Sequence, residues 1–343
     1  FTAAEARPNE VSPRAFSMSI PRTASVTYKF TPTIPPCVRP RDFLGNNAYM
    51  MVTALLVALA FGGFPEAYPK MNKDVAMGAL MVMMSFSLCS MTFKGLHLRD
   101  HILSVRAAFA LSFLLSTGTT VAMAFLFEGD VRNGWVLVAA VPSAVSVIPF
   151  TLVLGGDLEG TLVSSAALYL IALGLTPLLT LAFIGHAVSV VTLLWYVGML
   201  IAVPVAVSRP LRRANIDPYK RSMVINTAFA VLVISVAGAN RGVFLSEQGL
   251  LVALLAIAFV RTFVIGIAWE RLARRRKVPW SQRVPQVLFA THKNTGMAAA
   301  LAIALLGEVA AMPATICMTV DIAWLIYLSH YIYPHDSRPA PRR

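Results

Sequence analysis

The stretch that decides the fold is ATHKNTG, residues 290–296, which places the charged side chain of Lys293 roughly halfway along an apolar segment. A charge near the bilayer centre costs about 2.5–3.5 kcal/mol on insertion scales, so such residues usually face a polar interior. The neighbouring residues add polar side chains and a helix-weakening glycine: His292, Asn294, Thr295 and Gly296. We therefore predict a helix that is interrupted inside a membrane around a binding site, with a packed polar kink as the alternative.

The composition around this stretch is that of an integral membrane protein. Hydrophobic residues make up 57% of the chain, charged residues 13%, and the mean hydropathy is +0.69. Apolar segments of roughly 17–25 residues, the length of a spanning helix, follow one another along the chain. We expect ten, at residues 48–65, 75–93, 106–127, 134–154, 161–184, 187–207, 222–239, 248–269, 284–306 and 312–332.

The net charge of +13 is distributed unevenly over the joints between these segments. The two tails and the joints after the second, sixth and eighth segments hold 23 of the 29 Lys and Arg residues, whereas the opposite joints hold 4. By the positive-inside rule, both termini are expected in the cytoplasm. Such a basic surface meets the anionic headgroups of a lipid bilayer, so we expect no nucleic-acid partner. The expected location is the cell (inner) membrane, with an organelle membrane as the alternative.

Residues 1–43 are rich in Pro, Ser, Thr and Arg and contain no apolar run long enough for a signal peptide. We expect an irregular cytoplasmic tail, whose Arg and Ser bias weakly resembles an organelle transit segment. Because the chain starts without Met, we expect a fragment or a processed product. The cysteines have no metal-binding or disulfide spacing and are expected to be packing residues: Cys37, Cys89 and Cys317.

A second interruption is predicted in AAVPSAVSVIPFTLVLGGD, residues 139–157, because Pro142 and Pro149 each remove a helical hydrogen bond. Backbone groups freed at membrane depth must be buried in protein or face a polar cavity, although a simple proline kink is the alternative. Small polar side chains lie at this break: Ser143, Ser146 and Thr151. The third segment carries further hydroxyls that bond to their own helix or line a cavity: Ser112, Ser116, Thr117, Thr119 and Thr120.

The tenth segment contains a deep acid, Asp321. At 1.5 Å per residue, Lys293 and Asp321 lie about 13–14 Å from opposite edges of a core about 30 Å thick. We predict that they interact, directly or through water, since pairing lowers the cost of burying each charge. Pairing of Asp321 with Arg261 is the competing arrangement; alternatively, Arg261 extends to the interface. Two cations against one anion leave an excess of about one positive charge, which favours an anionic ligand.

The ten segments divide into two sets of five, residues 44–185 and 186–333, and residues 334–343 form a cytoplasmic tail. An odd number per set gives the sets opposite orientations if they share a fold. The predicted interruptions fall in the fourth and ninth segments, at equivalent positions. Interrupted helices at equivalent positions of inverted repeats are typical of a secondary transporter with its site near the midplane.

Over residues 44–333 the chain resembles the bile acid:sodium symporter family. The ordered motifs that carry the resemblance are MVMMSFSLCSMTFKGL (81–96), PSAVSVIPFTLVLGGD (142–157), LTPLLT (175–180), VPVAVSRPLRR (203–213), VAGANRG (236–242) and KNTGMAAALA (293–302). The resemblance implies an all-α protein of ten transmembrane helices in two inverted repeats. It also implies a panel domain (helices one, two, six and seven), a core domain holding the crossing interrupted helices, and alternating access.

The chain departs from this family at the positions of the sodium ligands. Where sodium-coupled members have a Glu and a Gln-Asn pair in the ninth helix, this chain has Phe289, Lys293 and Asn294. Their Ser-Asn pair in the fourth helix falls on Val147 and Ile148, which cannot bind an ion through their side chains. We infer that the fixed charge of Lys293 takes the place of bound sodium, so transport would be uniport, exchange or proton-coupled.

The sequence thus predicts a secondary transporter of a small organic anion. Thr151 is retained from the family pattern, and Ser112 and Ser165 fall near further polar positions of it. The expected site residues are Ser112, Ser143, Ser146, Thr151, Ser165, His292, Lys293, Asn294, Thr295 and Asp321. No catalytic residue, metal ligand or cofactor is expected, with sodium as a doubtful exception.

Other functions stay open at this point. One is a sodium symporter whose ion is held by backbone carbonyls and hydroxyls alone. Another is a non-transporting receptor or scaffold. A membrane-embedded enzyme is a poorer explanation, since His97 and His101 lack the acidic context of a metal motif. Arsenite export is disfavoured because related carriers use a Cys in the fourth helix and this chain has none there.

Overall fold

The computed structural model describes residues 47–64, 71–89, 98–185 and 188–334. The predicted N-terminal tail, residues 1–43, and all of the predicted C-terminal tail except residue 334 therefore lie outside the described residues. Cys37, His97 and His186 also lie outside the described residues. The buried Cys89 and Cys317 are free thiols.

The described residues are 86% helical and contain no β-strand. The longer helices are α2 (Asn47–Phe61), α3 (Met71–Leu88), α4 (Ile102–Phe109), α5 (Thr117–Ala124), α6 (Gly129–Ala140), α8 (Leu158–Ile184), α9 (Val190–Arg213), α10 (Pro218–Ala239), α12 (Gln248–Phe259), α13 (Ile265–Arg275), α14 (Trp280–Thr291), α15 (Thr295–Leu305) and α16 (Met312–Tyr327). The shorter ones are η1 (Leu98–His101), η2 (Ala110–Ser116), α7 (Val147–Val153), α11 (Arg241–Ser246), η4 (Val260–Val264), η5 (Val309–Ala311) and η6 (Leu328–Ile332).

Six helices among the described residues are long and apolar enough to cross a membrane. They are Arg99–Ala124, Leu158–Ile184, Val191–Arg213, Pro218–Ala239, Gln248–Arg275 and Val309–Ile332. Their large apolar side chains are often exposed, as at Leu103 (74%), Leu170 (70%) and Val191 (77%). Apolar side chains in such numbers on a helical surface are solvated by lipid rather than water. This is the architecture of a polytopic membrane protein.

Polar residues at the joints start several of these helices. Asp157 accepts a hydrogen bond from the backbone N–H of Gly160 at α8, and Asp217 accepts from two backbone N–H groups at α10. Ser189 caps α9 in the same way. Such caps satisfy N–H groups that have no partner within the helix, so these sequence positions fix where the apolar helices begin.

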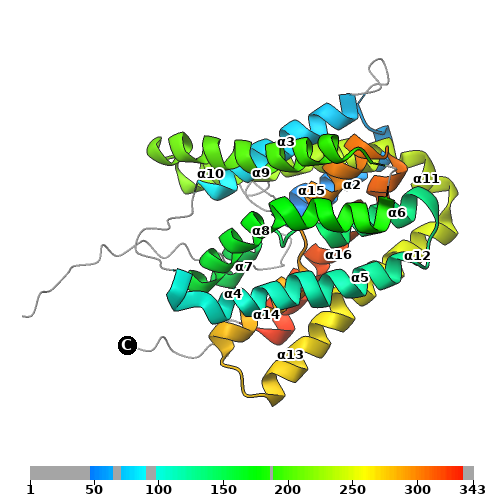
Figure 1. Ribbon diagram of the computed structural model, residues 1–343. Helices are drawn as coiled ribbons and strands as arrows, with labels where there is room; N and C mark the ends of the chain where they lie inside the picture. The colour runs from blue at the N-terminus through cyan, green and yellow to red at the C-terminus, as the bar shows by residue number, and fades with distance from the viewer. Residues whose placement is uncertain (1–46, 65–70, 90–97, 186–187, 335–343) are drawn as a thin grey trace, which may run out of the picture. The chain divides into compact units, whose positions relative to one another are not determined.

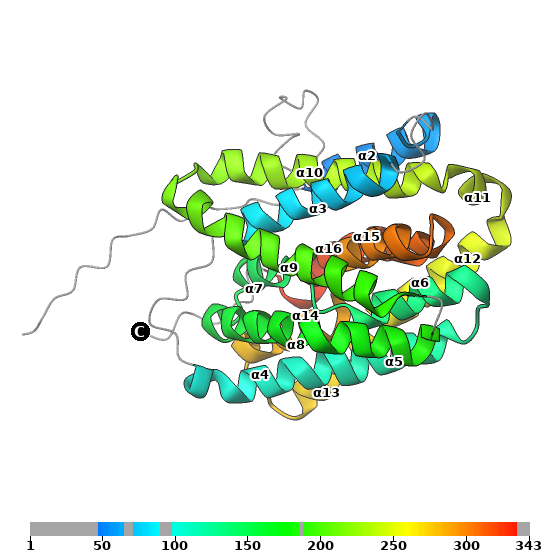
Figure 2. The ribbon, with the colours of Figure 1, turned by 45° about the horizontal axis from the view of Figure 1, so that its top comes forward.

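The helices pack in two sets. Helix α10 packs on α2 and α3, and α3 also packs on α9. The other set includes α6, which packs on α5, α8, α15 and α16, and α14, which packs on α4, α7 and α13. Helix α15 lies between the sets, because it contacts α3, α9 and α10 on one side and α6 and α16 on the other (Figures 1 and 2). Three of the long helices contain π-helical turns, namely η2, η4 and η6. Such turns occur often at functional sites.

The close packing of α6 against η5 depends on a glycine. A Cβ atom added at Gly134 would lie 2.1 Å from the backbone oxygen of Ala310. We expect Gly134→Ala to destabilise the protein by about 1–3 kcal/mol, since the backbone would have to move. Gly118→Ala in α5 is the matched control, because its Cβ would meet no atom within 4 Å and alanine favours a helix. Unfolding in detergent measures both, and equal stability of the two variants would contradict this packing.

Candidate functional site

Both predicted interruptions are present, and they meet. The chain leaves the helical conformation between α6 and α7, at residues 141–146, and between α14 and α15, at residues 292–294. Ser143 and Lys293 form an isolated antiparallel β-bridge. On either side of it, the N–H of Asn294 donates to the Pro142 carbonyl (2.8 Å) and the N–H of Ala144 donates to the His292 carbonyl (3.2 Å).

The carbonyl groups at the end of α6 are bonded by side chains from elsewhere in the chain. Pro142 lacks an N–H group, and the backbone turns extended at Val141. The hydroxyl of Thr117 donates to the Ala139 carbonyl (2.7 Å), and the hydroxyl of Thr176 donates to the Ala140 carbonyl (2.8 Å). Buried backbone groups left free would cost several kcal/mol each in a membrane. These hydroxyls therefore make the interruption tolerable.

Lys293 completes this arrangement. Its side chain is almost fully buried (1% exposed), and its Nζ donates to the Val141 carbonyl (3.0 Å) and to the hydroxyl of Thr117 (2.9 Å). Nζ also lies 4.8 Å from the centre of the Phe113 ring. The carbonyl end of a helix and the face of an aromatic ring both favour a positive charge. Lys293, in the interruption between α14 and α15, thus donates a hydrogen bond to the carbonyl end of α6, where the other interruption begins.

The predicted pair of Lys293 and Asp321 is wrong, and the competing pair is confirmed. Asp321 Oδ1 accepts from Arg261 Nη2 (2.7 Å) and from the hydroxyl of Thr262 (3.1 Å), both in η4. Arg261 is fully buried, so it does not extend to the interface. No ion pair joins Lys293 to an acid within the described part of the chain. Asp321 therefore neutralises Arg261, and Lys293 relies on uncharged groups.

We call the place where residues 141–146 meet residues 292–294 the crossing. Three further predicted residues contribute to it. The hydroxyl of Ser143 donates to the hydroxyl of Ser112 (2.8 Å), which ties the first interruption to η2. Asn294 caps α15 by accepting from the N–H of Met297, and its Nδ2 donates to the hydroxyl of Tyr169 in α8 (2.8 Å). Sequence reasoning missed Tyr169, whose place in the apolar run of α8 gives no signal of a polar contact.

Other predicted residues make only local bonds. The hydroxyl of Thr151 donates to the carbonyl of Val147 in its own helix. The Ser146 side chain is half-buried and does not cap α7. Thr295 is buried, and its backbone N–H donates to the Lys293 carbonyl. None of these three side chains bonds the opposite interruption.

Several buried polar atoms near the crossing have no hydrogen-bond partner among the described residues. They are His292 Nε2 and the hydroxyl oxygens of Ser116, Ser164 and Ser165. Nδ1 of His292 lies 3.1 Å from the hydroxyl of Thr291, and its ring packs edge-on against Phe150. Native structures leave few buried polar atoms unbonded, so each of these four atoms is a position where water or a ligand is expected.

The positions that the family resemblance assigns to sodium ligands carry apolar side chains. Phe289, Val147 and Ile148 are all buried. In the described ranges, no cluster of three or more His, Cys, Asp or Glu side chains is arranged to hold a metal ion.

Comparison with protein-family models and with curated proteins found no match for this chain. The resemblance to the bile acid:sodium symporter family thus stays an expectation carried by the motifs quoted above.

Proposed function

We propose that the protein is a secondary transporter of a small organic anion, that it works without sodium, and that Lys293 supplies the positive charge of a bound ion. One observation carries this proposal. The Lys293 ammonium is buried where two interrupted helices meet, and it bonds the carbonyl end of the opposite helix. A bound metal cation would also attract carbonyl oxygens. Such an ion can dissociate from the site, whereas the ammonium group of Lys293 is covalently attached.

The positions of the irregular segments support an inverted repeat. The interruptions lie in the predicted fourth and ninth spans, and the π-helical segments η2 and η4 lie in the third and eighth. A further π-helical segment, η6, lies at the end of the tenth span and belongs to neither pair. The members of each pair are five positions apart in the predicted order of spans, as expected for two repeats of five. Matching irregularities of this kind are the best pointer to a transporter site at the repeat interface.

The packing of the helices supports alternating access. In our proposal, the panel domain that the resemblance implies consists of α2, α3, α9 and α10, where α10 packs on α2 and α3, and α3 packs on α9. The crossing interruptions belong to the other set, and α15 borders both. In our proposal, the panel moves against the core and exposes the crossing to each side of the membrane in turn.

The charges at the crossing support an anion as the substrate. Lys293 and Arg261 are buried cations, and Asp321 neutralises one of them, which leaves one excess positive charge. Two residues with unpaired polar atoms are near these groups in sequence. Ser165 lies one helical turn before Tyr169, which contacts Asn294, and His292 directly precedes Lys293. They provide hydrogen-bond partners for a carboxylate or its hydration shell. A buried excess charge of this kind favours an anionic ligand over a cation.

The proposal predicts that sodium has no specific effect. Purified protein in proteoliposomes should accumulate or exchange a carboxylate from a radiolabelled panel equally well in sodium and in potassium. Its melting temperature in detergent should also be the same in the two salts, since an ion that binds only the folded protein would raise it. Clear stimulation by a sodium gradient would contradict the role of Lys293. Failure to move any member of a broad panel of organic anions would contradict transport.

A further inference from the structure

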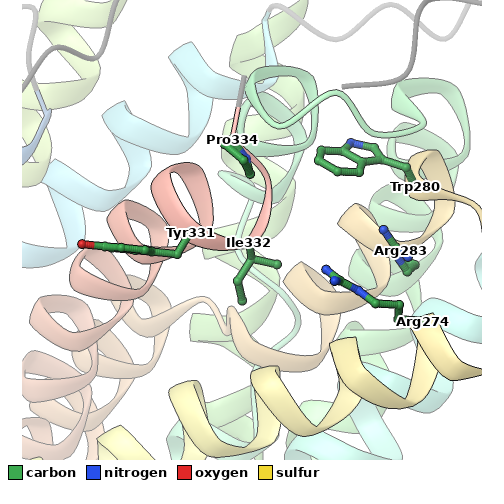
Figure 3. Close-up of a pocket in the computed structure, with 6 residues that line it drawn as sticks. All are labelled: Arg274, Trp280, Arg283, Tyr331, Ile332 and Pro334. Carbon is green, nitrogen blue, oxygen red and sulfur yellow. The ribbon is translucent and has the colours of Figure 1, made fainter. Parts of the chain in front are cut away.

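A second polar site lies away from the crossing, at the end of α13, the start of α14 and the end of η6. The cavity has a volume of about 400 Å³ and is lined by Arg274, Trp280, Arg283, Tyr331, Ile332 and Pro334. Figure 3 shows the guanidinium ends of Arg274 and Arg283 beside each other, while Tyr331 extends away from them. The cavity thus combines two cations with an aromatic and aliphatic edge.

One buried acid holds both arginines. Oε1 of Glu270 lies 3.1 Å from Arg274 Nη2 and 3.5 Å from Arg283 Nε. Oε2 of Glu270 accepts a hydrogen bond from the hydroxyl of Tyr333. Burial raises the pKa of Tyr333, as does the adjacent Glu270, so this hydroxyl keeps its proton and donates it to the carboxylate. Two guanidinium groups against one carboxylate leave one positive charge uncompensated in the cavity wall.

The wall is held in place by aromatic contacts. The indole N–H of Trp280 donates to the Leu154 carbonyl at the end of α7 (3.1 Å), and the ring packs edge-on against Tyr333. The guanidinium of Arg283 lies 5.9 Å from the centre of the Trp280 ring. The Arg283 side chain is only 13% exposed, whereas that of Arg274 is 61% exposed. Arg283 is therefore a fixed charge, whereas the guanidinium of Arg274, although bonded to Glu270, is open to a ligand from solvent.

The surroundings of the cavity match the boundary between lipid and water. Exposed cations lie in the same turns of α13 and just after it: Arg271, Arg275, Arg276 and Lys277. On the other side, a column of rings leads from the apolar helices to the cavity, through Phe263, Trp324, Tyr327 and the 75% exposed Tyr331. Aromatic rings with neighbouring Lys and Arg are typical of the headgroup level of a bilayer.

We propose that this cavity binds a phosphate-bearing anion, with Arg274 and Arg283 on the phosphate. Guanidinium groups suit phosphate oxygens because their paired N–H donors match the geometry of the oxygens. The 75% exposed ring of Tyr331 in the cavity lining favours an anionic phospholipid as the source, because it offers an acyl chain an apolar surface. A zwitterionic headgroup is a poor fit, since its ammonium would meet the cluster of arginines. This site does not depend on the proposed transport.

The test measures the melting temperature of the purified protein in detergent while phosphatidylglycerol, phosphatidylcholine, inorganic phosphate or glycerol 3-phosphate is added. Phosphatidylglycerol should raise it, and phosphatidylcholine should not. Arg274→Gln should raise the phosphatidylglycerol concentration for half the effect about fivefold, as expected for one cation at a membrane surface. Arg274→Lys, which keeps the charge but not the paired N–H donors, should restore only part of the response. Arg276→Gln, which removes an exposed cation outside the cavity, should change it by less than about twofold.

Each alternative result would overturn a defined part of the proposal. Equal stabilisation by phosphatidylcholine, or equal losses in Arg274→Gln and Arg276→Gln, would show general adsorption rather than a site. An equal effect of glycerol 3-phosphate or inorganic phosphate would assign the site to a soluble anion instead of a lipid. Because Arg274 is largely exposed, its variants should fold, and their melting temperatures without lipid provide the check.

Discussion

Replacing Lys293 by methionine is expected to lower organic-anion uptake into proteoliposomes by about tenfold or more. Methionine fills a similar volume but removes the donors to Val141 and Thr117, and an unbonded buried acceptor costs about 1–3 kcal/mol. The same change removes the only positive charge in the described part of the crossing interruptions. If the two interruptions separate, the site that they form is lost.

Lys73 offers a matched control for this experiment. Its Nζ also donates to a hydroxyl, that of Tyr196 (2.6 Å), and also lies 4.8 Å from the centre of an aromatic ring. It belongs to α3, however, and bonds neither interruption. Lys73→Met should therefore change uptake by less than about twofold. Lys293→Arg, which keeps the charge, serves as a second variant should the methionine variant fold poorly. Wild-type uptake by a well-folded Lys293→Met protein would refute the role of this residue.

Replacing Asp321 by asparagine is expected to lower the free energy of unfolding by about 3–5 kcal/mol. The reason is the fully buried Arg261, whose ion pair with Asp321 would be lost and whose charge would then be uncompensated. Chemical or thermal unfolding in detergent measures the loss. Asp130→Asn, at an exposed position, removes the same charge and should have little effect.

The double variant Arg261→Met with Asp321→Asn distinguishes a pair from two independent residues. Removing both charges leaves no uncompensated ion, so the double variant should recover most of the stability lost in Asp321→Asn. Additive losses from the two single variants would mean that the pair is not the source of the effect. Uptake by the double variant would then show whether the buried pair also serves transport.

The positions of six of the ten predicted apolar segments and of both interruptions agree with the structure, for simple physical reasons. A spanning helix needs a certain length of apolar chain, and Pro142 and Lys293 are each costly inside such a helix. The partners of the charges were harder to predict. Counting residues gives the depth of Asp321 in the membrane but not the direction in which it points around its helix. Depth alone therefore could not decide whether Lys293 or Arg261 pairs with Asp321. In the structure the partner is Arg261.

The actual partners of Lys293 left only a weak trace in the sequence. A helix that ends at a proline in a membrane must have carbonyl groups that need donors, and Thr117 was already among the hydroxyls of the third segment. Nothing in the pattern indicated which donor meets which carbonyl. The same holds for Tyr169 and for the π-helical turns at η2 and η4, which depend on packing between distant segments.

The bond between Lys293 and Val141 spans 152 residues of chain, and this has a consequence for biogenesis. Ribosomes add about 5–20 residues per second, so the first interruption waits roughly 8–30 s for its partner. During that time its free carbonyl groups need water, the insertion machinery or the hydroxyls of Thr117 and Thr176. Because of the order of synthesis, the hydrogen bonds from Thr117 and Thr176 can form first, and the bond from Lys293 to Val141 forms only after residue 293 has been added.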